Sequence, residues 1–198
     1  MTFFNPNANI LEEYNQFKEV HKGIWKMENF LTEDIVSHYL SIVQSMSEDE
    51  WAKIHWTYEE GDTMGSFWHK RMSKWIHPHE RIHSEFYRFF APEQVPLGML
   101  RTFNRMLPGE ITTPELCTMS NAWENNNNFN AKYRIGLYIG EFTGGDLVFP
   151  EIDFKLNVKQ NDIVVWEYPL KHYVAPVTSG IRYSYSDYLV PPADVWFS

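Results

Sequence analysis

The sequence predicts an α+β protein that is mainly β, with helices of the first half packed on one face of a jelly roll. The hydrophobic period changes to two from Leu97 onward, and short apolar runs then follow at close spacing. The chain has 198 residues, of which 43% are hydrophobic and 22% charged, which is typical of a globular domain. We therefore expect one domain over 1–198, with a mostly helical support region at 1–95 and a β core at 96–191.

The first half begins with apolar residues at helical spacing from Ile10 to Val20, which predict a helix over 9–23 that ends at Gly23. A short strand is expected over 23–31. Thr32 is a good N-cap for a helix over 33–46. Further helical turns are expected after a capping box of Ser47 and Glu50, and over 78–92 before Pro92.

The second half reads as strands separated by turns. Pro108 and Gly109 form one turn, Gly144 and Gly145 form another, and the run Asn125–Asn128 is typical of a long loop. Strands are expected within 97–107, 134–142, 146–152, 154–162, 162–168, 172–180 and 182–190. Several short strands at this spacing indicate a sandwich or barrel.

Composition excludes several classes of function. There are 26 acidic and 17 basic residues, and the resulting net charge of -9 argues against binding to a nucleic-acid backbone. Cys117 is the single cysteine, so an intramolecular disulfide is excluded and a reducing compartment is favoured. No apolar run approaches the ~18 residues of a membrane span, and we expect a cytoplasmic protein.

Three strings occur in a fixed order: "GGDLVFPE" at 144–151, "VKQNDIVVW" at 158–166 and "HYVAPVTSGIRYS" at 172–184. This ordered pattern resembles the Fe(II)- and 2-oxoglutarate-dependent dioxygenases, specifically the prolyl 4-hydroxylase-like group. The resemblance is close over 97–190, with Asn161 in place of the family's turn glycine. It implies a double-stranded β-helix, a cupin-like jelly roll.

The resemblance also implies roles for three residues. His172 corresponds to the distal iron ligand, a neutral imidazole. Arg182 corresponds to the arginine whose planar fork holds the far carboxylate of 2-oxoglutarate. Tyr138 corresponds to a tyrosine that donates a hydrogen bond to the same carboxylate, although a core tyrosine is an equally good interpretation of this position.

The family's other two iron ligands come as His-x-Asp after a turn such as Pro108-Gly109, and this pattern is missing. The aligned positions hold Glu115 and Cys117. Three interpretations stay open. A remodelled metal site forms from Glu115, Cys117 and His172, in which Glu115 and Cys117, at i and i+2, share one strand face. Alternatively, the motif is lost and the fold serves as a non-catalytic binding or structural module, or a group from the helical half completes the site.

An active protein would bind Fe(II) and 2-oxoglutarate, decarboxylate the latter and hydroxylate a C–H bond, such as that of a prolyl side chain in a protein or peptide. An inactive one would need no cofactor and would bind a protein partner at the barrel mouth. Compact oxygenases of this pattern occur in bacteria and phages. The resemblance therefore also admits a phage assembly component, located in the host cytoplasm or the virion.

Overall fold

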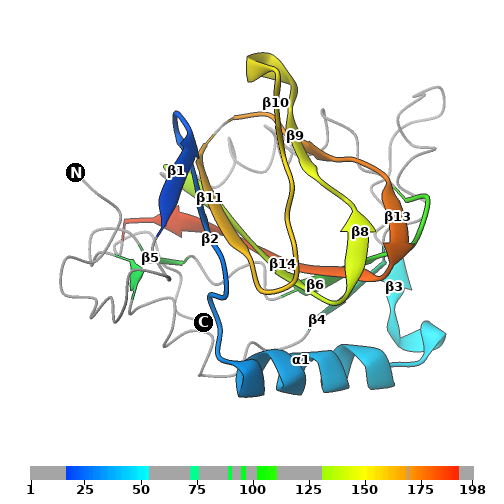
Figure 1. Cartoon of the computed structure of the whole chain (residues 1–198). Coiled ribbons are helices and arrows are strands. Elements are labelled where there is room, and N and C mark those ends of the chain that lie inside the picture. Colours follow the sequence, from blue (N-terminus) through cyan, green and yellow to red (C-terminus); the bar gives the residue numbers. More distant parts are fainter. Residues whose placement is uncertain are drawn as a thin grey trace.

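The computed structural model describes residues 17–53, 72–75, 89–90, 95–96, 102–110, 131–168 and 170–191. Within these residues strands predominate, and α1 (Glu33–Ser45) lies under one face of a large sheet, as Figure 1 shows. The expected α+β, mainly β architecture is confirmed for this part of the chain. None of the helices in the described ranges has the length and apolar character needed to span a bilayer.

The larger sheet has the strand order β1-β2-β11-β7-β14-β6-β4-β3, and β5 also pairs with β14. Its strands are β1 (Lys18–His21), β2 (Ile24–Met27), β3 (Ala52–Lys53), β4 (Met72–Trp75), β5 (Val95–Pro96), β6 (Thr102–Met106), β7 (Tyr133–Ile139), β11 (Ile163–Glu167) and β14 (Arg182–Val190). All the pairings are antiparallel. β14 is central because it pairs with β7 over seven residues and with β6 over four.

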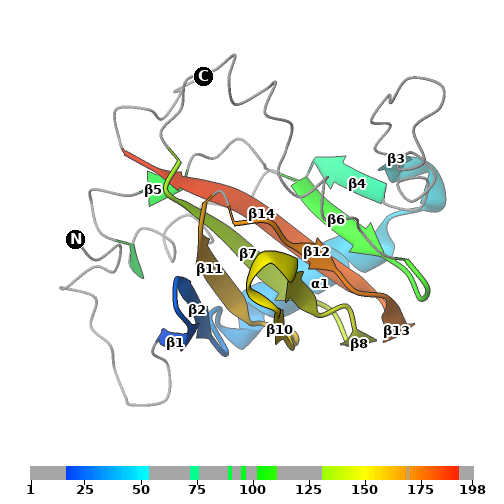
Figure 2. The same cartoon turned by 90° about the horizontal axis from the view of Figure 1, so that it is seen from above.

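Shorter strands lie across the other face of this sheet, as the two perpendicular views show (Figures 1 and 2). They are β8 (Phe142–Gly144), β9 (Leu147–Phe149), β10 (Phe154–Leu156), β12 (Tyr173–Val174) and β13 (Val177–Gly180). β9 pairs with both β10 and β12, and β8 pairs with β13. The short helical turns η1 (Glu48–Glu50) and η4 (Pro150–Ile152) join neighbouring elements.

Along each strand of the larger sheet, successive side chains point alternately into two separate hydrophobic cores. Odd-numbered residues of β7, β11 and β14 pack toward α1, whereas even-numbered residues face the short strands. The core on the α1 side includes Ile35, Val36, Tyr39, Val43, Phe103, Ile135, Leu137, Ile139, Ile163, Val165, Tyr183 and Tyr185. The core between the sheets includes Met106, Tyr138, Leu147, Phe149, Val164, Trp166, Val174 and Val177.

The helix predicted over 33–46 is confirmed as α1. Thr32 precedes it in extended conformation, and its carbonyl accepts hydrogen bonds from the amides of Ile35 and Val36. The capping box is also confirmed at η1, where the amide of Ser47 donates to the Glu50 carboxylate at 2.8 Å. Thr32 therefore stands at the predicted N-cap position, but its side chain makes no cap hydrogen bond.

The helix predicted over 9–23 is wrong for Lys18–His21, which form β1. Val20, which the helical spacing assigned to an apolar face, is 37% exposed. Gly23 has φ 78° and turns the chain between β1 and β2, where the Glu19 carboxylate accepts a hydrogen bond from its amide at 3.1 Å. Pairing with the sheet edge thus overrides the local helical pattern. The helix predicted over 78–92 lies outside the described residues except for Phe89 and Phe90.

Asn161 stands in the turn before β11 with φ 65°, a left-handed conformation that glycine adopts most easily. Its side chain bonds both ways with Leu31: the Leu31 amide donates to Oδ1 and Nδ2 donates to the Leu31 carbonyl, each at 2.8 Å. Its own amide donates to the Tyr138 carbonyl at 2.7 Å. The asparagine therefore ties the start of α1 to the strands, which a glycine at this position could not do.

Candidate functional site

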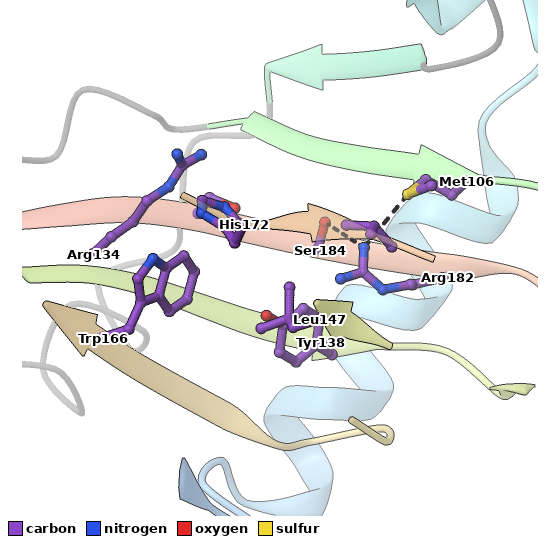
Figure 3. Close-up of a pocket in the computed structure, with 10 residues that line it drawn as sticks. Met106, Arg134, Tyr138, Leu147, Trp166, His172, Arg182 and Ser184 are labelled. Atoms are coloured by element: carbon purple, nitrogen blue, oxygen red, sulfur yellow. Dashed lines mark hydrogen bonds between the residues drawn. The ribbon is translucent and has the colours of Figure 1, made fainter. Parts of the chain in front are cut away.

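A cavity of about 30 Å³ opens between the two sheets, on the even-numbered face of the larger one. This volume admits at least one water-sized group. Figure 3 draws its ten lining residues and labels most of them. They are Met106, Arg134, Tyr138, Leu147, Trp166, His172, Val174, Arg182, Ser184 and Ser186. The cavity thus brings together His172, Arg182 and Tyr138, the three residues that the sequence comparison assigned to one site.

Arg182 begins β14 and is 2% exposed. Its guanidinium carbon lies 4.6 Å from the centroid of the Tyr138 ring, and Nη1 lies 3.4 Å from the Ser184 hydroxyl and 3.6 Å from the Met106 sulfur. A carboxylate that enters the cavity can accept two parallel hydrogen bonds from such a planar guanidinium.

Gly145 explains why the Gly-Gly turn precedes β9. A Cβ atom built at this glycine would lie 2.8 Å from Cδ of Arg182, so any larger residue would displace the arginine stem. Gly145 also has φ 66°, which other residues adopt at a cost. The turn therefore leaves the space through which Arg182 reaches the cavity.

Gly136 performs a similar task for Tyr138, two residues farther along the same face of β7. A Cβ atom at Gly136 would lie 2.5 Å from the Tyr138 hydroxyl and 3.4 Å from the edge of the Trp166 ring. The phenol therefore leans back along β7 over Gly136 instead of pointing across the barrel. This position keeps the hydroxyl close to the floor of the cavity.

His172 precedes β12 and is 4% exposed. Its Nδ1 lies 3.3 Å from the Leu170 carbonyl, and since a carbonyl only accepts, Nδ1 is the donor in this contact. The imidazole ring lies edge-to-face on Trp166 with centroids 4.7 Å apart. A backbone carbonyl bound to the other ring nitrogen is the usual arrangement for a histidine that ligates a metal.

Arg134 is a residue of the cavity that the sequence analysis missed. It lies on β7, is 7% exposed, and places its guanidinium carbon 5.3 Å from the Tyr188 ring centroid and 5.9 Å from that of Trp166. Its signal in the sequence is parity. Arg134, Gly136 and Tyr138 alternate with the apolar residues of the α1-side core, so an arginine here must face the interior of the barrel.

The cavity has a positive electrostatic character. None of its lining residues, as far as the structure describes them, carries a carboxylate, whereas two carry guanidinium groups. Asp187 on β14 is fully buried, but it has odd parity and accepts a hydrogen bond from Tyr185 of the α1-side core at 3.1 Å. The described lining therefore favours an anionic ligand.

The described residues do not fit an Fe(II) centre by themselves. Such a centre requires two histidines and a carboxylate on one face, and within the described ranges no three histidine, cysteine, aspartate or glutamate residues are grouped to hold a metal. Among these residues the cavity offers the single imidazole of His172. Glu115 and Cys117 lie outside the described residues, so their role as ligands stays a prediction.

Comparison with known proteins supports the fold. No family model and no curated protein matches the chain. Among solved structures, a Pseudomonas putida prolyl-4-hydroxylase is 15% identical with a TM-score of 0.58, covering 85% of this chain and 92% of that one. A Trichoplax adhaerens prolyl hydroxylase, solved with a hypoxia inducible factor peptide fragment, is 12% identical with a TM-score of 0.57, covering 89% and 87%.

The viral collagen prolyl hydroxylase of Paramecium bursaria Chlorella virus-1, solved as a 2OG complex, is 11% identical with a TM-score of 0.51 and covers 85% of this chain and 96% of that one. These identities are too low to transfer an activity, but the agreement extends over most of each chain. The expected double-stranded β-helix is thereby confirmed, and the chain has the fold of the 2-oxoglutarate-Fe(II) oxygenases.

Proposed function

We propose that this protein binds 2-oxoglutarate in the cavity between its sheets, with the far carboxylate of the ligand held by Arg182 and Tyr138. The observation that carries the proposal is the position of the buried Arg182 guanidinium at the cavity wall, 4.6 Å from the centroid of the Tyr138 ring. A bidentate carboxylate is the partner that best matches a planar guanidinium. The Tyr138 hydroxyl lies over Gly136 at the same cavity and can donate a hydrogen bond to an oxygen of the ligand carboxylate.

The ligand class is supported by charge. The cavity lies between the short strands and the central sheet. Its described lining is cationic and holds two serine hydroxyls, Ser184 and Ser186, as further donors. A protein of the same fold, the viral collagen prolyl hydroxylase, was solved as a 2OG complex.

Oxygenase activity is a further step that requires iron. Bound Fe(II) supplies oxygen activation in enzymes of this fold, and His172 is the described residue suited to hold it. The described residues supply one of the three protein ligands that such an iron centre needs. Prolyl or other peptide hydroxylation would depend on ligands from outside the described residues, and Glu115 and Cys117 are the candidates.

The proposal is tested by thermal denaturation and calorimetric titration of the full chain with 2-oxoglutarate. We expect saturable binding with a rise in Tm, because a ligand that binds the folded state stabilises it. Arg182→Gln should abolish the rise in Tm. Arg182→Lys should retain only part of it, since lysine keeps the charge but lacks the planar guanidinium group. Absence of stabilisation at millimolar 2-oxoglutarate, with and without Fe(II), would overturn the proposal.

Iron is tested separately, by anaerobic titration with Fe(II) in the presence of 2-oxoglutarate. A visible charge-transfer band that His172→Ala abolishes would establish a remodelled metal site. If that band is missing in the wild type but is created by Glu115→His with Cys117→Asp, the barrel is intact and the native motif is lost. Succinate release measured on the same samples then distinguishes turnover from binding.

A further inference from the structure

Two residues oppose one where the turn before β11 meets β7. The amide of Asn161 donates a hydrogen bond to the Tyr138 carbonyl at 2.7 Å, and the amide of Tyr138 donates to the Asp162 carbonyl at 3.1 Å. Regular pairing of the two strands begins one residue farther on, at Leu137 and Ile163. Since Asn161 also has φ 65°, these contacts define a β-bulge whose first residue is left-handed. The residue of β7 that faces this bulge is the tyrosine of the cavity.

The direction of the Tyr138 side chain agrees with a bulge beside it. A β-bulge increases the local twist and changes the direction in which side chains leave the sheet. The phenol of Tyr138 leans along β7, and its hydroxyl lies 2.5 Å from where a Cβ atom of Gly136 would be. Bulges are frequent beside functional sites, where they direct a side chain toward its partner. The bulge at Asn161 is therefore placed to set the position of the hydroxyl.

The side chain of Asn161 adds an anchor that a glycine lacks. Glycine is the usual first residue of a bulge with this conformation. The Leu31 amide donates to Oδ1 of Asn161, and Nδ2 donates to the Leu31 carbonyl, each at 2.8 Å. The Phe30 amide donates to the Asn161 carbonyl at 3.0 Å. Asn161 is 8% exposed, so water competes little for these bonds. The segment before α1 therefore holds the bulge in place.

The second residue of the bulge, Asp162, is anchored as well. Its carboxylate accepts a hydrogen bond from the Lys159 amide at 2.7 Å and lies 2.7 Å from the Lys26 ammonium group. The side chain of Asp162 is 3% exposed. Both residues that bond to the backbone of Tyr138 are thus fixed by groups outside β7. A ligand-binding side chain with such support loses less conformational entropy on binding.

We propose that Asn161 is a positioning residue of the ligand site. Its side chain, bonded to Leu31, holds the bulge that directs the Tyr138 hydroxyl toward the ligand carboxylate. The inference rests on the proposed function, because Tyr138 must contact the ligand. It goes beyond that function by assigning a role to a residue outside the described lining of the cavity. With glycine at position 161 the bulge keeps its backbone conformation but loses its anchor, so the hydroxyl is directed less well.

The test is a double-mutant cycle, measured by calorimetric titration of the full chain with 2-oxoglutarate. Wild type, Asn161→Gly, Tyr138→Phe and the double variant are compared under one condition, with or without Fe(II), in which the wild type binds. We expect Asn161→Gly to weaken binding by about 3- to 10-fold, no more than Tyr138→Phe, because it misdirects a hydrogen bond without removing the donor. In the Tyr138→Phe background it should change the affinity by less than about 2-fold. Equal losses in both backgrounds, or no loss in the wild-type background, would overturn the inference.

Two control variants separate positioning from stability. Val43→Ala truncates a side chain that is 2% exposed in the core beside α1. It should lower the Tm at least as much as Asn161→Gly and leave the affinity unchanged at a temperature where every variant is folded. Asn29→Gly places glycine at the other left-handed asparagine of this region, φ 52°, and should also leave the affinity unchanged. If Val43→Ala weakens binding as much as Asn161→Gly does, lost stability explains the effect and the inference is wrong.

The cycle also distinguishes this inference from the proposed function. If the wild type binds 2-oxoglutarate and Tyr138→Phe binds it equally well, the positioning role of Asn161 is refuted while the contact with Arg182 stands. If the wild type binds no 2-oxoglutarate with or without Fe(II), the proposed function itself fails, and the inference fails with it.

Discussion

The guanidinium of Arg182 lies 4.6 Å over the ring of Tyr138, so the cation that is proposed to hold a carboxylate rests on the phenol that is proposed to help it. The ring and the hydroxyl of Tyr138 therefore have separate tasks. The ring supports the arginine by a cation–π contact and belongs to the inner core. The hydroxyl lies back over Gly136, at the floor of the cavity.

Tyr138→Phe separates these tasks. The variant keeps the ring, so we expect its Tm to stay close to that of the wild type. The affinity for 2-oxoglutarate should fall by about 10-fold or more, because a hydrogen bond to a charged group contributes about 1.5–3 kcal/mol. Calorimetric titration measures this directly, and an unchanged affinity would show that the hydroxyl has no contact with the ligand.

Gly136→Ala tests the close approach of the Tyr138 phenol. The added methyl group would meet the hydroxyl at 2.5 Å and the ring carbon beside it at 3.1 Å. We expect a loss of about 1–3 kcal/mol in the free energy of unfolding, typical of overpacking, together with weaker ligand binding. In a Tyr138→Phe background the same change should cost less, because the closest contact is gone. Equal costs in both backgrounds would contradict this geometry.

Asn161→Gly tests whether the turn before β11 depends on the side chain or on the backbone. Glycine accepts φ 65° more easily, but it removes the two hydrogen bonds with Leu31. We expect a net destabilisation of about 1–2 kcal/mol in chemical denaturation, since each such bond contributes about 1 kcal/mol. Asn29→Gly is the matched control, because Asn29 has φ 52° and is exposed. That variant should be as stable as the wild type or slightly more so.

Glu48→Gln should make stability depend less on acid pH. The Arg105 guanidinium donates two hydrogen bonds of 2.7 Å to the Glu48 carboxylate, and these hold the pKa of Glu48 below its ordinary value of 4.5. A lowered pKa in the folded state means that the stabilisation is present above the unfolded-state pKa and is lost as the pH falls through the folded-state value. We therefore expect a lower Tm for Glu48→Gln at pH 7, with a difference from the wild type that shrinks as the pH falls below 4.5 and disappears below the lowered pKa of the folded state.

Asp49→Asn is the control for this prediction, because Asp49 is the neighbouring exposed carboxylate of η1. Its Tm difference from the wild type should be small at both pH values. A Glu48→Gln difference that persists unchanged at low pH would place the effect outside the ion pair with Arg105.

Sequence patterns predicted the elements that depend on local chemistry. The helix α1 was predicted from Thr32 as an N-cap residue type and from an apolar face. The strands β7, β11 and β14 were predicted from runs rich in β-branched and aromatic residues. The helix prediction was wrong over β1, because the apolar spacing of so few residues fits a helix as well as a strand. Pairing with β2 decided the outcome. Local patterns contain no information about which partner strand is available.

The site was predicted in part. The resemblance assigned His172 and Arg182 to one site, and both residues line the same cavity. Arg134 was missed because it lies 38 residues before His172, and its contact with Trp166 arises from the pairing of β7 with β11. The parity of β7 could have found it, since the neighbouring even positions, Gly136 and Tyr138, both line or floor the same cavity.

The division of each central strand into odd and even positions has a consequence for how such a protein can change. Tyr183, Tyr185 and Leu189 of β14 hold the sheet on α1, while Arg182, Ser184 and Ser186 line the cavity. Substitutions on one side leave the contacts of the other side in place. The lining of the barrel interior can therefore change at alternate positions of a strand while the packing of the sheet on α1 persists.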